Sequence, residues 1–209
     1  YAVQDGVLFE GASLTSVDGN ITVSAKMASG DSVPIYMTTG TSNIGATGTG
    51  VVYIKEDSAN ASTTASNLNN LNLNTAGDAY IIFNRYTGGA GTTYTTGGTL
   101  RVEPAAASFP VTMTFPGSAT IGSTTAALVL GKSATSGNVI LGSAVVSMVG
   151  PITLIGGTAG IETNTTVTGA GNRVTIKGAA IAYVYASKTV QTNGGDIVVW
   201  ANFDKTAGA

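Results

Sequence analysis

The residues that could do chemistry in this chain are carboxylates, hydroxyls and a few lysines and arginines. The chain has 209 residues, with no histidine and no cysteine. It therefore lacks a Ser-His-Asp triad and an imidazole general base. It also lacks thiolate nucleophiles, disulfides and the usual ligands of zinc and haem. What remains is 11 acidic residues, 9 basic residues and 32 threonines.

Paired carboxylates are the first catalytic candidates, because glycoside hydrolysis needs two carboxyl groups roughly 5–10 Å apart. Glu56 and Asp57 are adjacent in the sequence, and on a strand they would point to opposite faces. Asp196 and Asp204 come from consecutive elements and could approach each other. The acids are otherwise spread singly along the chain, with no cluster of three or four. We therefore expect no catalytic residues and no enzymatic activity.

Glycine-rich turns hold several of the polar residues that could bind an ion. Asp18, Asp78 and Asp196 lie in such turns, where a carboxylate can accept hydrogen bonds from nearby backbone N–H groups. The segment 193–196 (NGGD) is one unrepeated fragment of a calcium-binding repeat. The loop 45–50 (GATGTG) lacks the Lys-Ser/Thr of a phosphate-binding loop. We expect neither a metal nor a cofactor.

Aromatic side chains near the end of the chain are the candidate contact residues. Tyr183 and Tyr185 would share one face of a strand, and Trp200 follows in the next element. Exposed aromatic rings stack on the apolar faces of sugars, so these three residues are candidates for contact with a glycan or another surface. The alternative is that they cap or fill the core.

Short strands must position these residues. Helical periodicity is absent, whereas β-branched runs alternate with small polar turn residues. Most runs are three to five residues long, shorter than the usual strand. The expected strands are residues 7–9, 21–23, 51–54, 71–73, 80–83, 100–102, 111–115, 128–130, 139–141, 152–155, 174–176, 182–185 and 197–200.

Glycine turns recur before these strands, mostly at intervals of about 20–30 residues. A repeat of this length is typical of solenoids, propellers and arrays. The low aromatic content disfavours a propeller, and the strands are short for a β-sandwich. Corners of Gly, Asn and Asp with a narrow stack of Val, Ile, Leu, Ala and Thr favour a parallel β-helix. We expect an all-β, parallel β-helix or solenoid with irregular loops.

Three stretches resemble repeats of large secreted bacterial adhesins of the filamentous-haemagglutinin kind. Ser187–Asp204 (SKTVQTNGGDIVVWANFD) is similar to their phrase "I.T.GG.V.LWA..D". Gly11–Val23 (GASLTSVDGNITV) and Gly97–Phe109 (GGTLRVEPAAASF) resemble two further units. The resemblance implies a right-handed parallel β-solenoid and secretion across the outer membrane by dedicated machinery. It also implies a stalk-like or adhesive role.

Domain organisation and partners follow from the repeat and from the charge. We expect residues 1–209 to form a single solenoid segment of a longer repeat protein, with 31–70 as an irregular decoration. A net charge of −2 gives no electrostatic basis for binding nucleic acid, and the longest apolar run, 179–186, is too short to cross a bilayer. The expected partners are neighbouring repeats, secretion machinery and surface glycans, and the expected location is secreted or cell surface.

An antiparallel β-sandwich of the pilin kind is the alternative fold. In that case residues 1–10 would be exchanged between subunits of a self-assembling filament. Residues Asp5 and Gly6 interrupt the alternation that such a strand requires. A carbohydrate-active β-helix enzyme is a third class, which the missing acid cluster disfavours.

Overall fold

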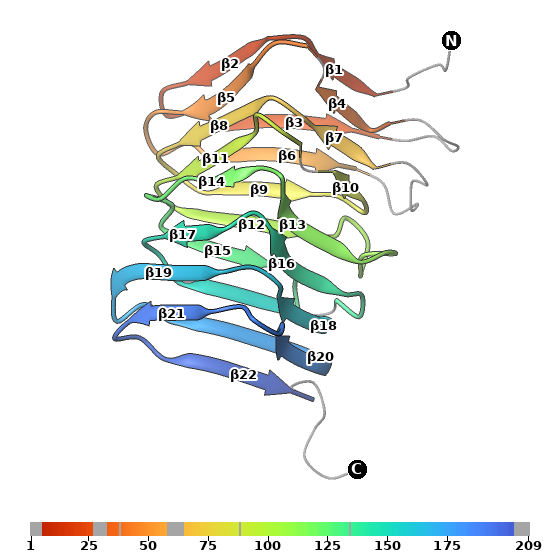
Figure 1. The fold of residues 1–209 in the computed structure, drawn as a ribbon. Helices are drawn as coiled ribbons and strands as arrows, with labels where there is room; N and C mark the ends of the chain where they lie inside the picture. The colour runs from red at the N-terminus through yellow and green to blue at the C-terminus, as the bar shows by residue number, and fades with distance from the viewer. Residues whose placement is uncertain are drawn as a thin grey trace.

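The computed structural model describes residues 6–26, 33–37, 39–57, 65–87, 89–133 and 135–202. Within these ranges the regular structure consists of β-strands, and every strand pairing is parallel. Figure 1 shows the strands stacked in layers from the N-terminal to the C-terminal end. The chain is a parallel β-solenoid, which confirms the predicted fold class, and the antiparallel sandwich was wrong.

Each layer has three faces, and the path makes about seven turns. The first face contains β1 (Val7–Phe9), β4 (Ile35–Met37), β7 (Ser66–Leu68), β10 (Tyr86–Thr87), β13 (Met113–Gly117) and β16 (Val139–Ser143). The second face contains β2 (Ser13–Ser16), β5 (Ser42–Ala46), β8 (Leu71–Thr75), β11 (Thr93–Thr96), β14 (Thr120–Ile121), β17 (Val146–Met148), β19 (Thr165–Ala170) and β21 (Val190–Asn193). The third face contains β3 (Ile21–Ala25), β6 (Val52–Glu56), β9 (Ala79–Ile82), β12 (Thr99–Glu103), β15 (Ala127–Leu130), β18 (Ile152–Ile161), β20 (Val174–Val184) and β22 (Ile197–Ala201).

Two long strands join faces near the C-terminal end. The first part of β18 pairs with β15 on the third face, and its last residues pair with β16 on the first face. Both parts of β18 pair with β20, with a register shift between Gly156 and Thr158. The corner that separates these two faces in earlier layers is therefore replaced by a bent, continuous strand.

Register partners in adjacent layers lie 19 to 31 residues apart. The shortest step joins Val146 to Thr165, and the longest joins Ile21 to Val52. This range matches the spacing of the glycine turns in the sequence. Variation in loop length, and not in strand length, accounts for the irregular repeat.

The hydrophobic core is a set of columns that run along the solenoid axis. On the third face every layer adds one residue to the same column, which consists of Val23, Ile54, Ile81, Val102, Leu130, Leu154, Ile176 and Val199. All of these except Val199, in the last layer, are buried. Because alternate residues of a strand point to opposite sides, the residues between them face outward. Each buried aliphatic side chain stabilises the fold by about 1.5–3 kcal/mol relative to an exposed one.

The ladders of the first and second faces are each interrupted once, whereas the third face is continuous. On the first face the ladder β1-β4-β7-β10 ends at β10, and β13 pairs only with β16 of the next layer. On the second face the ladder from β2 to β14 is followed by a separate ladder, β17-β19-β21. The connection before β13 contains Pro104 and Pro110, and proline supplies no N–H to a ladder.

The segment 31–70, expected as a decoration, contains β4, β5, β6 and β7 in register with neighbouring layers. Residues 31, 32, 38 and 58–64 of that segment lie outside the described residues.

Candidate functional site

The three predicted aromatic residues lie at the C-terminal end of the solenoid. Tyr183 is in the last part of β20, Tyr185 directly follows that strand, and Trp200 is in β22. The hydroxyl of Tyr183 donates a hydrogen bond to the Glu162 carboxylate. Burial raises the pKa of Tyr183 to about 12, and the hydrogen bond to Glu162 adds to this effect.

These aromatic residues do not form one platform. The ring of Tyr183 lies against Gly160, its register partner in the previous layer. Trp200 instead faces Lys177, whose Nζ lies 5.7 Å from the ring centroid. Within the described residues no ring contact joins Trp200 to either tyrosine. The contact role of all three residues stays a prediction.

The adjacent acids Glu56 and Asp57 point to opposite sides, as the strand geometry predicts. Glu56 is buried, and its Oε2 accepts a hydrogen bond from the backbone N–H of Asn84 at 3.1 Å. Asp57 is exposed, and Asp204 lies outside the described residues. No group of three or more acidic side chains within the described ranges is close enough to hold a metal ion.

The polar residues at the corners hold successive layers together. Asp18 accepts a hydrogen bond from the N–H of Thr49 at 3.2 Å, and Asp78 accepts one from Thr99 at 2.7 Å. In both pairs the donor lies one layer further along the chain. The prediction that turn acids bind backbone N–H groups is therefore confirmed for Asp18 and Asp78, although the bond joins two layers and not the two ends of one turn.

Three shallow hollows lie on the second face. Their volumes are about 210, 360 and 300 Å³. The first two adjoin each other over β5 and β8, since Thr47 and Asn74 line both. The third lies over β19 and β21, where Thr168 and Gln191 line it. The lining residues described for these hollows are uncharged, and most carry a hydroxyl or an amide.

Amides and hydroxyls on this face repeat from layer to layer. Asn43, Asn72 and Thr93 are register partners in successive layers. The side-chain amide of Asn72 donates a hydrogen bond to Asn43 Oδ1 at 3.0 Å. Gly45 permits the close approach of β5 to β8, since a Cβ at this position would lie 1.8 Å from the carbonyl oxygen of Asn74. The second face is thus a neutral polar surface with regularly spaced donors and acceptors.

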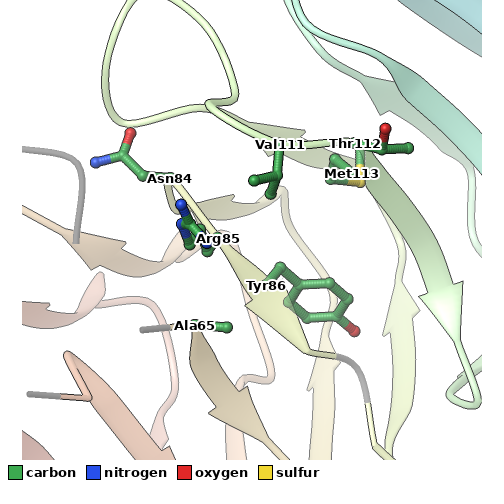
Figure 2. A pocket seen from close by; sticks show the side chains of 7 residues that line it. All are labelled: Ala65, Asn84, Arg85, Tyr86, Val111, Thr112 and Met113. Carbon is green, nitrogen blue, oxygen red and sulfur yellow. The ribbon is translucent and has the colours of Figure 1, made fainter. Parts of the chain in front are cut away.

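The break in the first face leaves a separate opening of about 170 Å³ between β10 and β13. Figure 2 shows Arg85 and Tyr86 on one side of it and Val111 and Met113 on the other. Sequence reasoning missed this opening, because it depends on a missing strand pairing. The prolines before β13 were the only signal that could have indicated it.

A pair of tyrosines lies in the interior beside this opening. The hydroxyls of Tyr86 and Tyr94 are 2.7 Å apart, and both rings pack against Phe115. Burial raises the pKa of each hydroxyl far above its ordinary value of 10.0. These hydroxyls therefore remain protonated in the folded protein, where they bond to each other within the core.

The last described layer exposes apolar residues whose partners in the preceding layer are fully buried. Val199 extends the core column of the third face, and Ile197 extends the parallel column that contains Val174, yet the two side chains are 49% and 46% exposed. Their partners Val174 and Ile176 are fully buried. The described solenoid therefore ends on an uncovered apolar layer.

Comparison with protein-family models, curated proteins and solved structures finds no match for this chain. None of the described segments forms a helix that could span a membrane.

Proposed function

We propose that this chain is a structural and adhesive segment of a large secreted or cell-surface protein. The observation that carries the proposal is the core column, in which each layer of the third face adds one residue in register. A stack of this kind gives a stiff rod whose stability comes from contacts between neighbouring layers. The resemblance to adhesin repeats and the low charge support the same role, and secretion machinery of the outer membrane would be a partner.

The second face is the contact surface in this proposal. Its hollows are lined by neutral hydroxyls and amides, which suit the hydroxyl groups of surface glycans. Tyr183, Tyr185 and Trp200 would supply a second contact at the C-terminal end. The chain makes contact without catalysis in this proposal, and removal of any single acid would remove no activity.

Binding to an array of immobilised neutral and acidic glycans tests the adhesive role. We expect the wild-type chain to bind a subset of neutral glycans. Asn74→Ala, which alters two hollows, should weaken that binding, whereas Thr22→Ala on the exposed part of the third face should not. Thermal melting checks that both variants are folded. Absence of binding to any glycan, or equal loss in both variants, would contradict the proposal, as would turnover of a polysaccharide.

A self-assembling filament subunit is the second candidate, and the uncovered last layer favours it. Association through this end would bury Ile197 and Val199. The strand exchange of residues 1–10, which belongs to the alternative pilin-like fold, has no support in the described part, because β1 pairs with β4 of the same chain. Sedimentation velocity at increasing protein concentration distinguishes the two functions, since only a filament subunit forms progressively larger species.

A further inference from the structure

We propose that the opening between β10 and β13 is a binding site for a carboxylate group on a short apolar stem, with Arg85 as its anchor. This site is independent of the adhesive role proposed above. It lies on the first face, where the strand ladder is interrupted, and it is distinct from the hollows of the second face.

The Arg85 side chain lines the opening beside β10. Its Nε is buried without a hydrogen-bond acceptor, and within the described residues it forms no ion pair with an acid. A guanidinium carries its charge at all physiological pH values and offers donors in a planar fork that matches a carboxylate. A buried donor without a partner is costly, so an anion that enters the opening would relieve that cost.

The nearest polar neighbours have other partners. The carboxylate of Glu56 accepts hydrogen bonds from Asn84, and Oδ1 of Asn84 accepts one from the N–H of Ala106 at 2.8 Å. The hydroxyl of Tyr86 is paired with Tyr94 in the core. These neighbouring polar groups therefore form hydrogen bonds with other residues. The guanidinium of Arg85 can thus pair with an incoming anion.

Thr112 also lines the opening. Its Oγ1 accepts a hydrogen bond from the side-chain amide of Asn138 at 3.2 Å. A hydroxyl has one hydrogen to donate in addition to its acceptor positions, and no acceptor for the Thr112 hydroxyl is found among the described residues. Arg85 and Thr112 thus line the opening from two different layers, since they precede β10 and β13 respectively. Figure 2 shows the Thr112 hydroxyl turned away from Arg85, so Arg85 is the donor that would hold the anion.

The walls and the volume define the size of the ligand. Ala65, Val111 and Met113 give apolar walls beside the guanidinium. The volume of about 170 Å³ is below the roughly 300–1,000 Å³ of sites that hold drug-sized molecules. A carboxylate with two to four carbons meets both conditions. It could come from a free small acid or from an Asp or Glu side chain of another protein, which share this chemistry.

The experiment is a titration of the isotope-labelled chain with butyrate, followed by NMR. We expect saturable shifts at the amides of Thr112 and Met113, and no such shifts with the neutral analogue butyramide. Arg85→Gln should weaken butyrate binding at least about tenfold, because it removes a charge-assisted pair. The matched control Arg101→Gln should not, because Arg101 already faces Glu103 at 3.8 Å elsewhere on the surface.

Two further variants keep the test decisive. Arg85→Lys keeps the charge but loses the planar fork, and it should bind more weakly than wild type. Val111→Phe, at a half-exposed position, narrows the opening without changing the guanidinium, and it should also weaken butyrate binding. This variant tests the site even if Arg85→Gln does not fold. Equal binding by Arg85→Gln and wild type would overturn the site.

A parallel titration with a short peptide that contains one central Glu identifies the source of the carboxylate. Tighter binding of the peptide than of butyrate assigns the site to a side chain of a partner protein. Equal or tighter binding of butyrate assigns it to a free small acid. Absence of binding by both probes overturns the proposal.

Discussion

Individual polar residues hold this solenoid together by bonding between layers. Asp18 and Asp78 accept N–H groups of the following layer, and Asn164 accepts the N–H of Thr189 in the same way at 3.1 Å. A strand ladder cannot satisfy backbone groups where the chain turns a corner, so side chains must supply the acceptors. The few acids of the chain are thereby used largely for structure.

The Tyr86–Tyr94 pair predicts a loss of stability at high pH. Because burial raises both pKa values above 10.0, the folded chain keeps two protons that the unfolded chain releases above this pH. The free energy of unfolding should therefore be level below about pH 9 and fall as pH rises above 10. Urea unfolding between pH 8 and 11 measures this fall.

Two variants separate this pair from the other tyrosines. Tyr94→Phe removes one buried hydroxyl and should reduce the slope of stability against pH. Tyr185→Phe, at an exposed position, should change the slope less than Tyr94→Phe. Equal slopes in wild type and Tyr94→Phe would refute the assignment.

Val139→Asp tests the buried stack directly. Val139 is fully buried and pairs with Met113 and Ala159 in the layers on either side. An unpaired carboxylate at this position should destabilise the fold by about 3 kcal/mol or more. Val145→Asp is the control, because Val145 is 71% exposed and should change stability by about 0.5 kcal/mol or less. Wild-type-like melting of Val139→Asp would show that the stack is assigned incorrectly.

At the scale of elements, the sequence revealed the third face much better than the second. The strands of the third face contain two or more large apolar residues, as in β12 and β22. On the second face β2 (SLTS) and β11 (TYTT) each contain a single large side chain, Leu14 or Tyr94, and their other residues are Ser or Thr. With so little alternation, polar strands of this kind cannot be distinguished from turns. Of the second face, only β8 was expected.

The long strands β18 and β20 were also not predicted as such. Residues 174–176 and 182–185 were expected as two strands, whereas β20 runs from Val174 to Val184. Gly178 lies between them, where a Cβ would be 1.8 Å from the carbonyl oxygen of Ile181. Glycine was interpreted as a turn signal, but here it permits a tight bend within a paired strand.

Gly45→Ala tests how much the stability of the second face depends on the close approach of β5 and β8. The added Cβ would lie 1.8 Å from backbone of β8, so β5 and β8 must separate. We expect a loss of about 1–3 kcal/mol in the free energy of unfolding, measured by urea denaturation. Gly142→Ala is the control, because its nearest contacts are side-chain atoms at 3.3 Å that can shift. Equal stability of the two variants would contradict the proposed packing.

The whole molecule behaves as a one-dimensional stack, which determines where it is weakest. The third-face ladder places β12 between two neighbours, whereas β22 pairs only with β20. Opening of the last layer breaks one interface, while opening of a central layer breaks two. The uncovered apolar side chains of β22 give it less stabilisation by burial as well.

Native-state hydrogen exchange should therefore show a gradient along the axis. We expect hydrogen-bonded amides of β22 to exchange with an opening free energy lower than that of β12 by about 3 kcal/mol, roughly a hundredfold in rate. The comparison uses only amides bonded within a ladder, which controls for simple exposure. Equal protection of both strands would show that the chain opens as a single unit.

The sequence by itself determined the class of the fold and the period of the repeat. Both follow from local properties, since glycine and Asn or Asp favour corners and β-branched residues favour short strands. The tertiary structure alone decided which residues lie beside one another across layers. It brought the carboxylate of Asp18 to the N–H of Thr49. It also left β10 and β13 unpaired, which created the opening lined by Arg85. Pairing in this parallel solenoid joins residues 19 to 31 positions apart, and because the loops differ in length, no local sequence pattern reveals that register.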